Sequence, residues 1–222
     1  MEMRTNFHKK MRGIQDEIMV LGNMAEVAIS QSVDALKNRN LILAHQIIND
    51  DIKINRKRYE IEEKCTQLIA TQQPMASDLR TMICVLNIIT ELERIGDYAE
   101  GIAKIVIMIG DEPPLKPLID IPRMADKIIQ MLRQSLDAFV QRNAEAAIQV
   151  VDEDDEIDNL YNQVFRELLT FMIEDPRTIT RATRLIWVAH NLERSADRVT
   201  NICERIVFIV TGKMQEIGAS NY

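Results

Sequence analysis

Glycine, proline and aromatic residues are scarce in this sequence. Its 222 residues include 7 Gly and 6 Pro, and only 5% of them are aromatic, whereas 46% are apolar. Glycine and proline interrupt helices, and aromatic residues are enriched in strands. So few of all three in so long a chain predicts long helices rather than a β-sheet protein.

Other absences exclude several classes of function. The net charge of −7 argues against a nucleic-acid-binding protein that works through overall charge. The sequence has no CxxC or Cys/His cluster, so a structural zinc site is not expected. It also lacks a glycine-rich phosphate loop, a G-x-S-x-G motif and a reactive Cys/His pair. We therefore expect neither a nucleic-acid partner nor an enzyme.

Long apolar runs and a secretory signal are missing as well. Residues 1–13 contain no apolar core of a signal peptide, and the longest apolar runs, 105–109 and 206–210, are too short to cross a bilayer. Cys65, Cys84 and Cys203 are an odd number on apolar helical stretches, which predicts buried free thiols in a reducing compartment. We expect a cytoplasmic protein.

Apolar residues recur at helical spacing in six long segments. The expected helices are 3–37, 41–71, 77–109, 122–141, 144–173 and 178–214. Short turns between them predict antiparallel packing. Residues 110–117 hold three of the six prolines, and we place the boundary between two domains, 1–112 and 113–222, in this segment. The tail 218–222 is expected to be frayed.

The second half of the chain repeats the first. QSVDA at 31–35 returns as QSLDA at 134–138, and Arg39-Asn40 returns as Arg142-Asn143. ELERIGDYAEGIAKIVI at 91–107 aligns without a gap with NLERSADRVTNICERIV at 191–207. The predicted fold class is therefore all-α, with two tandem repeated antiparallel three-helix bundles.

An acidic motif lies in each copy of this long repeat. Glu93 and Asp97, like Glu193 and Asp197, are four residues apart, so each pair lies on one helix face. Like charges in that relation cost a few tenths of a kcal/mol. The same unfavourable pair of carboxylates occurs in both copies at equivalent positions, which indicates that a positive group lies next to each pair. A solvated face neutralised by neighbouring arginines is the alternative.

The expected hairpins place further carboxylates opposite these motifs. Asp154 and Asp158 lie 22 and 18 residues before Pro176, while Glu193 and Asp197 lie 17 and 21 residues after it. In an antiparallel hairpin these distances differ by only one residue, or about 1.5 Å. Asp158 should therefore face Glu193, and Asp154 should face Asp197.

The same count around Met75 brings Asp51 and Asn55 opposite Glu93 and Asp97 in the first half. Four oxygen ligands at one level of two helices suit a hard cation, because a carboxylate cluster without one repels itself. The ion would be divalent or trivalent, among Fe, Mn, Mg, Ca and Zn. The candidate ligands are Asp154, Asp158, Glu193, Asp197 and Asn201 in the second half, and Asp51, Glu93, Asp97 and Glu100 in the first.

These motifs resemble the PhoU family of phosphate transport accessory proteins. The most specific segments are QPMASDLR at 73–80, LERIGD at 92–97 and LERSADRVTNI at 192–202, and the resemblance covers essentially the whole chain. It implies two similar three-helix bundles that can carry metal clusters on paired acidic motifs. Asn55, with four basic residues nearby, departs from that pattern, so the second half is expected to bind metal more tightly.

The resemblance also implies a regulatory role. The expected partners are the ATPase subunit of a phosphate ABC transporter and a sensor histidine kinase, and the protein would hold the phosphate-starvation response off when phosphate is plentiful. A homodimer is implied too, reaching the membrane only through its partners. The carboxylates leave two alternatives: a carboxylate-bridged di-metal enzyme, or a metal-free helical scaffold.

Overall fold

The computed structural model describes residues 2–217, with side chains from Phe7 onward, and the regular structure in this range is entirely helical. The predicted fold class, two three-helix bundles, is confirmed. The first bundle consists of α1 (Glu2–Asn38), α2 (Leu41–Gln72) and α3 (Ser77–Ile109). The second consists of α4 (Asp120–Gln141), α5 (Ala144–Asp152), α6 (Asp154–Glu174) and α7 (Ile179–Thr211), with a short 3-10 helix, η1 (Pro176–Thr178), before α7.

One expected helix, 144–173, is wrong as a single element. The structure interrupts it at Glu153, whose N–H donates to the Val150 carbonyl at 3.2 Å. The interruption places Asp154, Asp155 and Glu156 in the first turn of α6. Carboxylates are favoured at a helix N-terminus by the helix dipole and disfavoured when stacked in mid-helix. The run of acids therefore explains the break.

The end of the last helix also differs from the prediction. α7 ends at Thr211 rather than at residue 214, because Gly212 takes a φ of +72° and its N–H donates to the Phe208 carbonyl at 2.9 Å. Glycine adopts this left-handed conformation without steric cost, and it commonly ends helices. The tail 218–222, for which fraying was expected, lies outside the described residues.

The repeat predicted from sequence recurs in the turns. Asn40 caps α2 by accepting from the Leu43 N–H at 3.0 Å, and Asn143 caps α5 by accepting from the Ala146 N–H at 3.1 Å. The residue before each cap, Arg39 or Arg142, has a positive φ in both copies. The two halves therefore begin their second helix in the same way.

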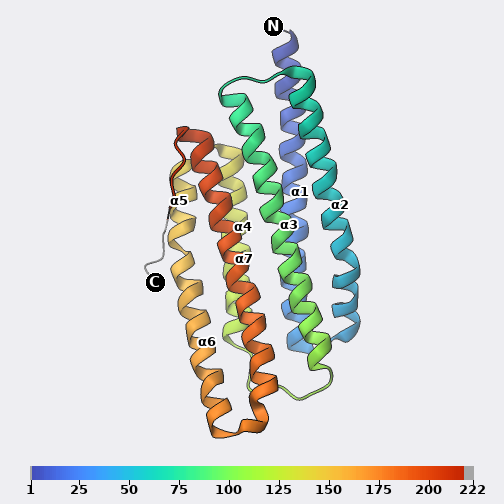
Figure 1. The fold of residues 1–222 in the computed structure, drawn as a ribbon, viewed down its shortest axis with the longest axis vertical. Helices are drawn as coiled ribbons and strands as arrows, with labels where there is room; N and C mark the ends of the chain where they lie inside the picture. The colour runs from blue at the N-terminus through green and yellow to red at the C-terminus, as the bar shows by residue number, and fades with distance from the viewer. Residues whose placement is uncertain (1, 218–222) are drawn as a thin grey trace.

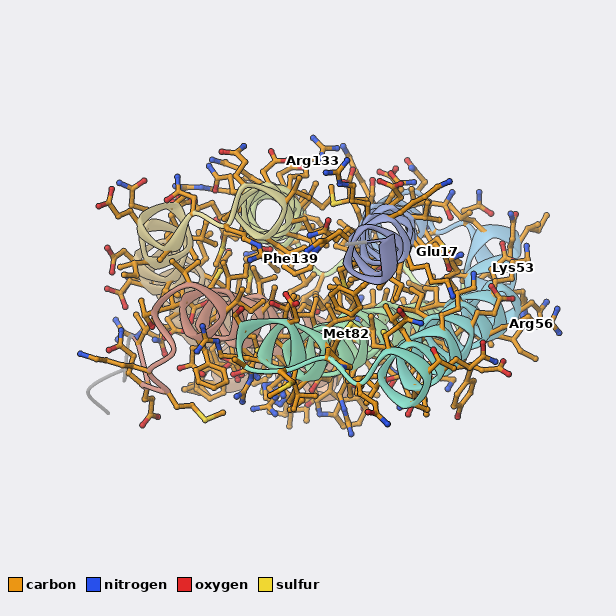
Figure 2. The ribbon with its side chains drawn as sticks, turned by 90° about the horizontal axis from the view of Figure 1, so that it is seen from above. Glu17, Lys53, Arg56, Met82, Arg133 and Phe139 are labelled. Carbon is orange, nitrogen blue, oxygen red and sulfur yellow. The ribbon has the colours of Figure 1, made fainter. Side chains whose placement is uncertain are left out.

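The two bundles pack side by side. α3 and α7 lie next to each other and run in opposite directions, with α1 and α4 behind them (Figure 1). Seen along the helices in Figure 2, Met82 and Phe139 point into the interior, whereas Arg133 points outward. Met82 and Phe139 are buried, and apolar residues of both bundles form one continuous core.

A glycine allows the close approach of α1 and α4. A Cβ atom at Gly22 would overlap the side chain of Leu136 on α4. Any larger residue at this position would therefore push the two helices apart or displace the leucine. Gly22 therefore serves the contact between the two bundles.

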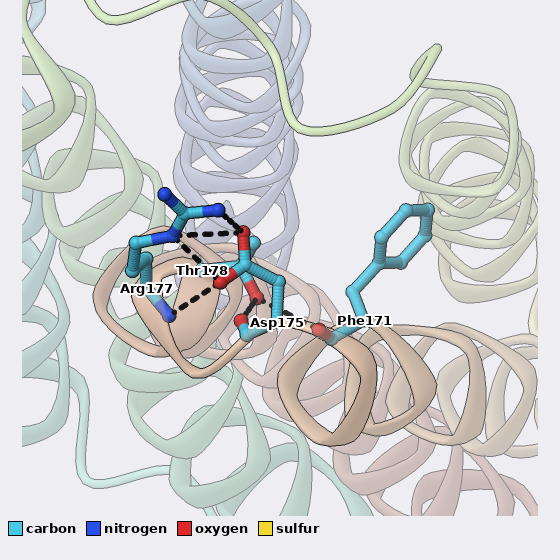
Figure 3. Close-up of polar contacts among 4 residues, drawn as sticks. All are labelled: Phe171, Asp175, Arg177 and Thr178. Atoms are coloured by element: carbon cyan, nitrogen blue, oxygen red, sulfur yellow. Dashed lines mark hydrogen bonds and ion pairs between the residues drawn. The ribbon is translucent and has the colours of Figure 1, made fainter.

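The turn between α6 and α7 is held by a compact set of hydrogen bonds (Figure 3). The Thr178 hydroxyl lies 2.9 Å from the Phe171 carbonyl oxygen and 2.7 Å from that of Asp175. The Asp175 carboxylate accepts from the backbone N–H of Arg177 at 3.1 Å and pairs with its guanidinium. This turn sets the level at which α6 and α7 face each other.

Two further expectations concern thiols and membranes. Cys65, Cys84 and Cys203 are free and buried, as predicted, and burial raises the pKa of Cys65 and of Cys203 to about 12. Thiols of this kind are inert. Among the described helices, none is long and apolar enough to cross a membrane.

Candidate functional site

Four carboxylates of the second half lie together on the α6–α7 hairpin. Asp154 and Asp158 are one turn apart on α6, and Glu193 and Asp197 are one turn apart on α7. Burial, followed by the charges of Asp158 and Asp197, raises the pKa of Asp154 to about 7. Burial, followed by Asp197 and Asp158, raises the pKa of Glu193 to about 7. Because each shift arises partly from the facing helix, the geometry agrees with the expected register.

Neighbouring groups offset only part of this repulsion. Arg194 Nη1 lies 3.2 Å from Asp197 Oδ2. His190 Nδ1 lies 3.2 Å from Glu193 Oε2, but not in hydrogen-bond geometry, and this buried oxygen has no hydrogen-bond partner among the described residues. Burial keeps the pKa values of Asp158 and Asp197 raised as well. The cluster thus holds negative charge that the protein itself does not neutralise.

The first half brings Asp51 of α2 beside Glu93, Asp97 and Glu100 of α3. Burial, followed by the charges of Glu100 and Asp97, raises the pKa of Asp51. Burial and then Asp97 raise the pKa of Glu93. The α2–α3 hairpin therefore has the same register as α6–α7, and it also brings Glu100 to the cluster.

More carboxylate oxygens accept hydrogen bonds in the first cluster than in the second. Asn55 Nδ2 donates to Asp51 Oδ2 at 2.7 Å, and Lys104 Nζ donates to Glu100 Oε2 at 2.6 Å. Arg58 lowers the pKa of Glu93, although burial outweighs it. Asp51 Oδ1 stays buried without a hydrogen-bond partner in the described part of the chain.

Asn201, the amide among the expected ligands, contacts the other bundle. Its Nδ2 lies 3.3 Å from Oε2 of Glu91 on α3, and Arg198 Nη1 lies 3.3 Å from the same oxygen. A ligand role for Asn201 stays a prediction. Glu91 was not among the residues predicted from sequence, although it opens the long repeat.

The contacts between α3 and α7 follow an approximate two-fold axis. Glu91 meets Asn201, and a Cβ atom at Gly101 would lie 3.0 Å from Asn191 Oδ1. Position 91 repeats as 191 and position 101 as 201, so the two contacts are exchanged by the axis. Counting residues from the turn of one hairpin cannot predict a contact between two different hairpins. The gap-free repeat of 91–107 and 191–207 was the feature of the sequence that could have predicted this one.

The donor set fits a hard cation. The nine candidate ligands present carboxylate or amide oxygens, the donors that Mg, Ca, Mn and Fe ions prefer. Asp51 Oδ1 and Glu193 Oε2 are buried oxygens that a cation would satisfy. Within residues 2–217, however, no three His, Cys, Asp or Glu side chains are arranged to hold a metal ion. Sharing an ion requires the carboxylates to rotate toward one another, so metal ligation stays a prediction.

Both clusters lie at the outer seams of the hairpins. Asp97 is exposed, and Asp158 and Glu193 are partly buried, whereas Leu92 and Leu192 just below them are fully buried in the apolar core. The carboxylates therefore lie at the edge of the core, partly open to solvent, while Asp51 Oδ1 and Glu193 Oε2 are buried.

Comparison with known proteins gives one consistent family. The family model of the PhoU domain matches this chain twice, over residues 18–106 and 121–206. A curated relative from Clostridium acetobutylicum, the phosphate-specific transport system accessory protein PhoU homolog, is 37% identical over 96% of this chain and 98% of its own. The phosphate-specific transport system accessory protein PhoU of Escherichia coli is 34% identical over 93% of this chain and 86% of its own.

Solved structures agree with this comparison. The crystal structure of PhoU from Pseudomonas aeruginosa has a TM-score of 0.88 and 32% identity, covering 93% of this chain and 100% of that one. The phosphate transport system regulatory protein PhoU from Streptococcus pneumoniae also has a TM-score of 0.88, with 30% identity over 95% of this chain and 100% of that one. Since these similarities extend over both repeats, the chain belongs to the PhoU family.

Proposed function

We propose that this protein is a cytoplasmic regulatory accessory protein of a phosphate-specific transport system. The observation that carries the proposal is the similarity over 93% or more of the chain to relatives named as phosphate-specific transport system accessory proteins. In this proposal it binds the transporter ATPase subunit and the sensor histidine kinase of the phosphate response. It holds that response off when phosphate is plentiful, acts as a homodimer and turns over no substrate.

The position of the carboxylates supports a regulator over an enzyme. A di-metal enzyme on a helical bundle places its ligands inside the bundle, on facing helices. Here Asp97 is exposed and Asp158 and Glu193 are partly buried, whereas the fully buried positions beside them, Leu92 and Leu192, are apolar. A cluster that is partly open to solvent suits contact with a partner protein better than a reaction that must exclude water.

Metal binding is part of the proposal. A hard cation in the second half would be held by Asp154, Asp158, Glu193 and Asp197, and one in the first half by Asp51, Glu93, Asp97 and Glu100, with Asn201 as a further oxygen donor. The ion would supply the positive charge that offsets the repulsion among these carboxylates. The buried and unpartnered oxygens of Asp51 and Glu193 support this assignment.

Elemental analysis separates this proposal from a metal-free scaffold. Protein purified without chelator should carry one of the proposed ions, and anomalous scattering from a crystal should place it on the α6–α7 hairpin. Protein that carries no metal under these conditions, and gains none on incubation with each ion, would contradict metal binding.

Deletion of the gene tests the regulatory role. In phosphate-rich medium the deletion strain should express its phosphate-starvation genes, and a plasmid copy of the wild-type gene should restore repression. Unchanged expression in the deletion strain would count against the regulatory role.

A matched pair of variants connects that role to the cluster. A double variant, Asp158→Asn with Glu193→Gln, should lose repression and recover less of the ATPase subunit and kinase in pull-down experiments. Asp126→Asn on α4 also removes an exposed carboxylate, but it lies away from both clusters and should behave as wild type. If the double variant and Asp126→Asn behaved alike, the acidic cluster would have no part in regulation.

A further inference from the structure

A cavity of about 240 Å³ lies between α1 and α2 in the first half. Met24 of α1 and the buried Ile47 and Ile54 of α2 give it apolar walls, and Gly96 of α3 also lines it. This volume is just below the range of about 300–1,000 Å³ that is typical of drug-sized ligands. The cavity therefore has room for a small molecule with a short apolar body.

Charged groups of α2 line the same cavity. Asp51 contributes a carboxylate whose Oδ1 is buried and has no hydrogen-bond partner within the described chain. Asp50 also lines it, paired at 2.7 Å with Lys53, whose side chain is 66% exposed. A buried acceptor without a partner costs free energy that a ligand donor could recover.

The internal repeat shows what occupies the equivalent place in the second half. Helices α1 and α2 correspond to α4 and α5–α6 with a shift of 103 residues, as the buried Ser32 and Ser135 and the caps Asn40 and Asn143 confirm. The shift pairs Met24 with Lys127, Asp50 with Glu153 and Lys53 with Glu156. Lys127 Nζ lies 2.7 Å from Glu153 Oε2 and 3.3 Å from Glu156 Oε2, and its side chain is only 18% exposed.

The second half thus places a lysine ammonium where the first half has a cavity. Three substitutions account for the difference, and the first is Lys53 in place of Glu156, which puts the cation on α2 rather than on the first helix of the half. Met24 has no charge to occupy the place of Lys127, and Gly96 replaces Ala196 of the repeat. A Cβ atom at Gly96 would come within 2.9 Å of Ile54 Cδ1, so an alanine there would push a cavity wall inward. The first half has no cation at the place of Lys127 and keeps that room, because its Lys53, at the position of Glu156, pairs with Asp50 from α2 instead.

We propose that this cavity binds a small primary ammonium compound in the place that Lys127 occupies in the second half. The ammonium group donates hydrogen bonds to the carboxylates of Asp50 and Asp51, and its aliphatic chain lies against Met24 and Ile54. A lysine side chain is a butylammonium group, so an aliphatic chain of about four carbons matches the space. The site shares Asp51 with the proposed first-half metal cluster, so a metal ion and the ammonium group would compete for this carboxylate, but it does not depend on the regulatory role.

The test is a titration with n-butylammonium chloride, followed by calorimetry and by protein NMR. Chelator is present throughout, so that no metal competes for Asp51. We expect one site per chain, with shift changes centred on the residues that line the cavity. Butan-1-ol has the same chain without the charge and should bind at least tenfold more weakly, while sodium chloride at equal ionic strength should cause no such shifts.

Three variants locate the site. Met24→Lys supplies the missing ammonium from the protein and should weaken butylammonium binding at least tenfold, whereas the matched control Met24→Leu should stay within twofold of wild type. Lys53→Met removes the cation that competes for Asp50 and should tighten binding at least twofold. Circular dichroism verifies that each variant folds, and if Met24→Lys does not, the result for Lys53→Met decides.

Several results would overturn the proposal. They are the absence of saturable butylammonium binding, equal binding of butan-1-ol, unchanged affinity in Met24→Lys, or no gain in Lys53→Met. Loss of repression in a deletion strain bears only on the regulatory role, so the two proposals fail independently.

Discussion

At the scale of single residues, the two acidic clusters differ most at one repeated position. Asn55 of the first half donates a hydrogen bond to Asp51, whereas its counterpart Asp158 adds a second negative charge beside Asp154. The amide of Asn55 therefore gives Asp51 of the first cluster a hydrogen bond. At the equivalent place in the second cluster, the two carboxylates repel each other.

The first prediction follows from this charge difference. Each carboxylate adds attraction for a hard cation, and nearby basic side chains subtract from it. Asp197→Asn should therefore lose more bound metal than Asp97→Asn, as measured by elemental analysis of protein purified without chelator. Equal metal loss from the two variants, or a chelator that leaves the wild-type melting temperature unchanged, would contradict a dominant second site.

The second prediction concerns pH. Burial and neighbouring charges raise the pKa values of Asp154 and Glu193 to about 7 in the folded protein. Between about pH 4 and pH 7 the folded state then holds protons that the unfolded chain has released, so the free energy of unfolding falls as pH rises. We expect the melting temperature of chelator-treated protein to decrease over this interval.

The control for the pH effect is Glu193→Gln. Glutamine carries no titrating proton and removes one charge from the cluster, so the decrease in melting temperature should become shallower. Glu145→Gln, at an exposed position on α5, should leave the slope as in wild type. A wild-type melting temperature that rises between pH 4 and pH 7 in chelator would refute the assignment.

At the scale of elements, the α6–α7 turn positions the second cluster. Thr178 is buried, and its hydroxyl contacts the carbonyls of both Phe171 and Asp175. The two contacts join the end of α6 to η1. They help to hold the register that brings Asp158 opposite Glu193.

The third prediction tests this turn. Thr178→Val keeps the shape of the side chain but removes the hydroxyl, leaving the carbonyl contacts unmade, and should lower the free energy of unfolding by about 1–3 kcal/mol. Thr180→Val, two residues on and exposed, should change it by less than about 0.5 kcal/mol. Urea denaturation measures both, and equal effects would show that the hydroxyl does not hold the turn.

At the scale of the whole molecule, the bundles are joined by polar contacts at the α3–α7 seam. Glu91 accepts from Asn201 and pairs with Arg198, and both charged side chains are about one-fifth exposed. The Arg194 side chain lies beside Tyr98, which contributes most to raising the pKa of Arg194. These residues connect the seam to the second acidic cluster, because Arg194 also pairs with Asp197.

The fourth prediction compares two ion pairs that join the halves. Glu91→Ala leaves Arg198 partly buried without its partner, and should lower the free energy of unfolding by about 1–3 kcal/mol. Glu26→Ala breaks the pair with Arg133, whose side chain is 64% exposed, and should cost about 0–1 kcal/mol. Urea denaturation, with a double-mutant cycle through Arg198→Met, measures the coupling. A larger loss for Glu26→Ala would show that burial does not decide the strength of these pairs.

Much of the fold and of each cluster could be predicted from the sequence, because both depend on short-range geometry. Helical periodicity places apolar residues on one face, and a constant rise per residue lets positions be counted from a short turn. That count places Asp158 opposite Glu193 and Asp97 near Asp51 from the sequence alone. Whether these carboxylates hold a metal is not decided by such counting.

Other features were decided only by tertiary structure. The break at Glu153 depends on where a run of acids is best placed relative to a helix end, which the apolar pattern does not report. The contacts of Glu91 and Gly22 join helices about 110 residues apart, where no short turn sets the register and packing alone chooses it. The cavity beside Asp51 likewise appears only in three dimensions, because it depends on Met24 and Gly96 from two different helices meeting at one place.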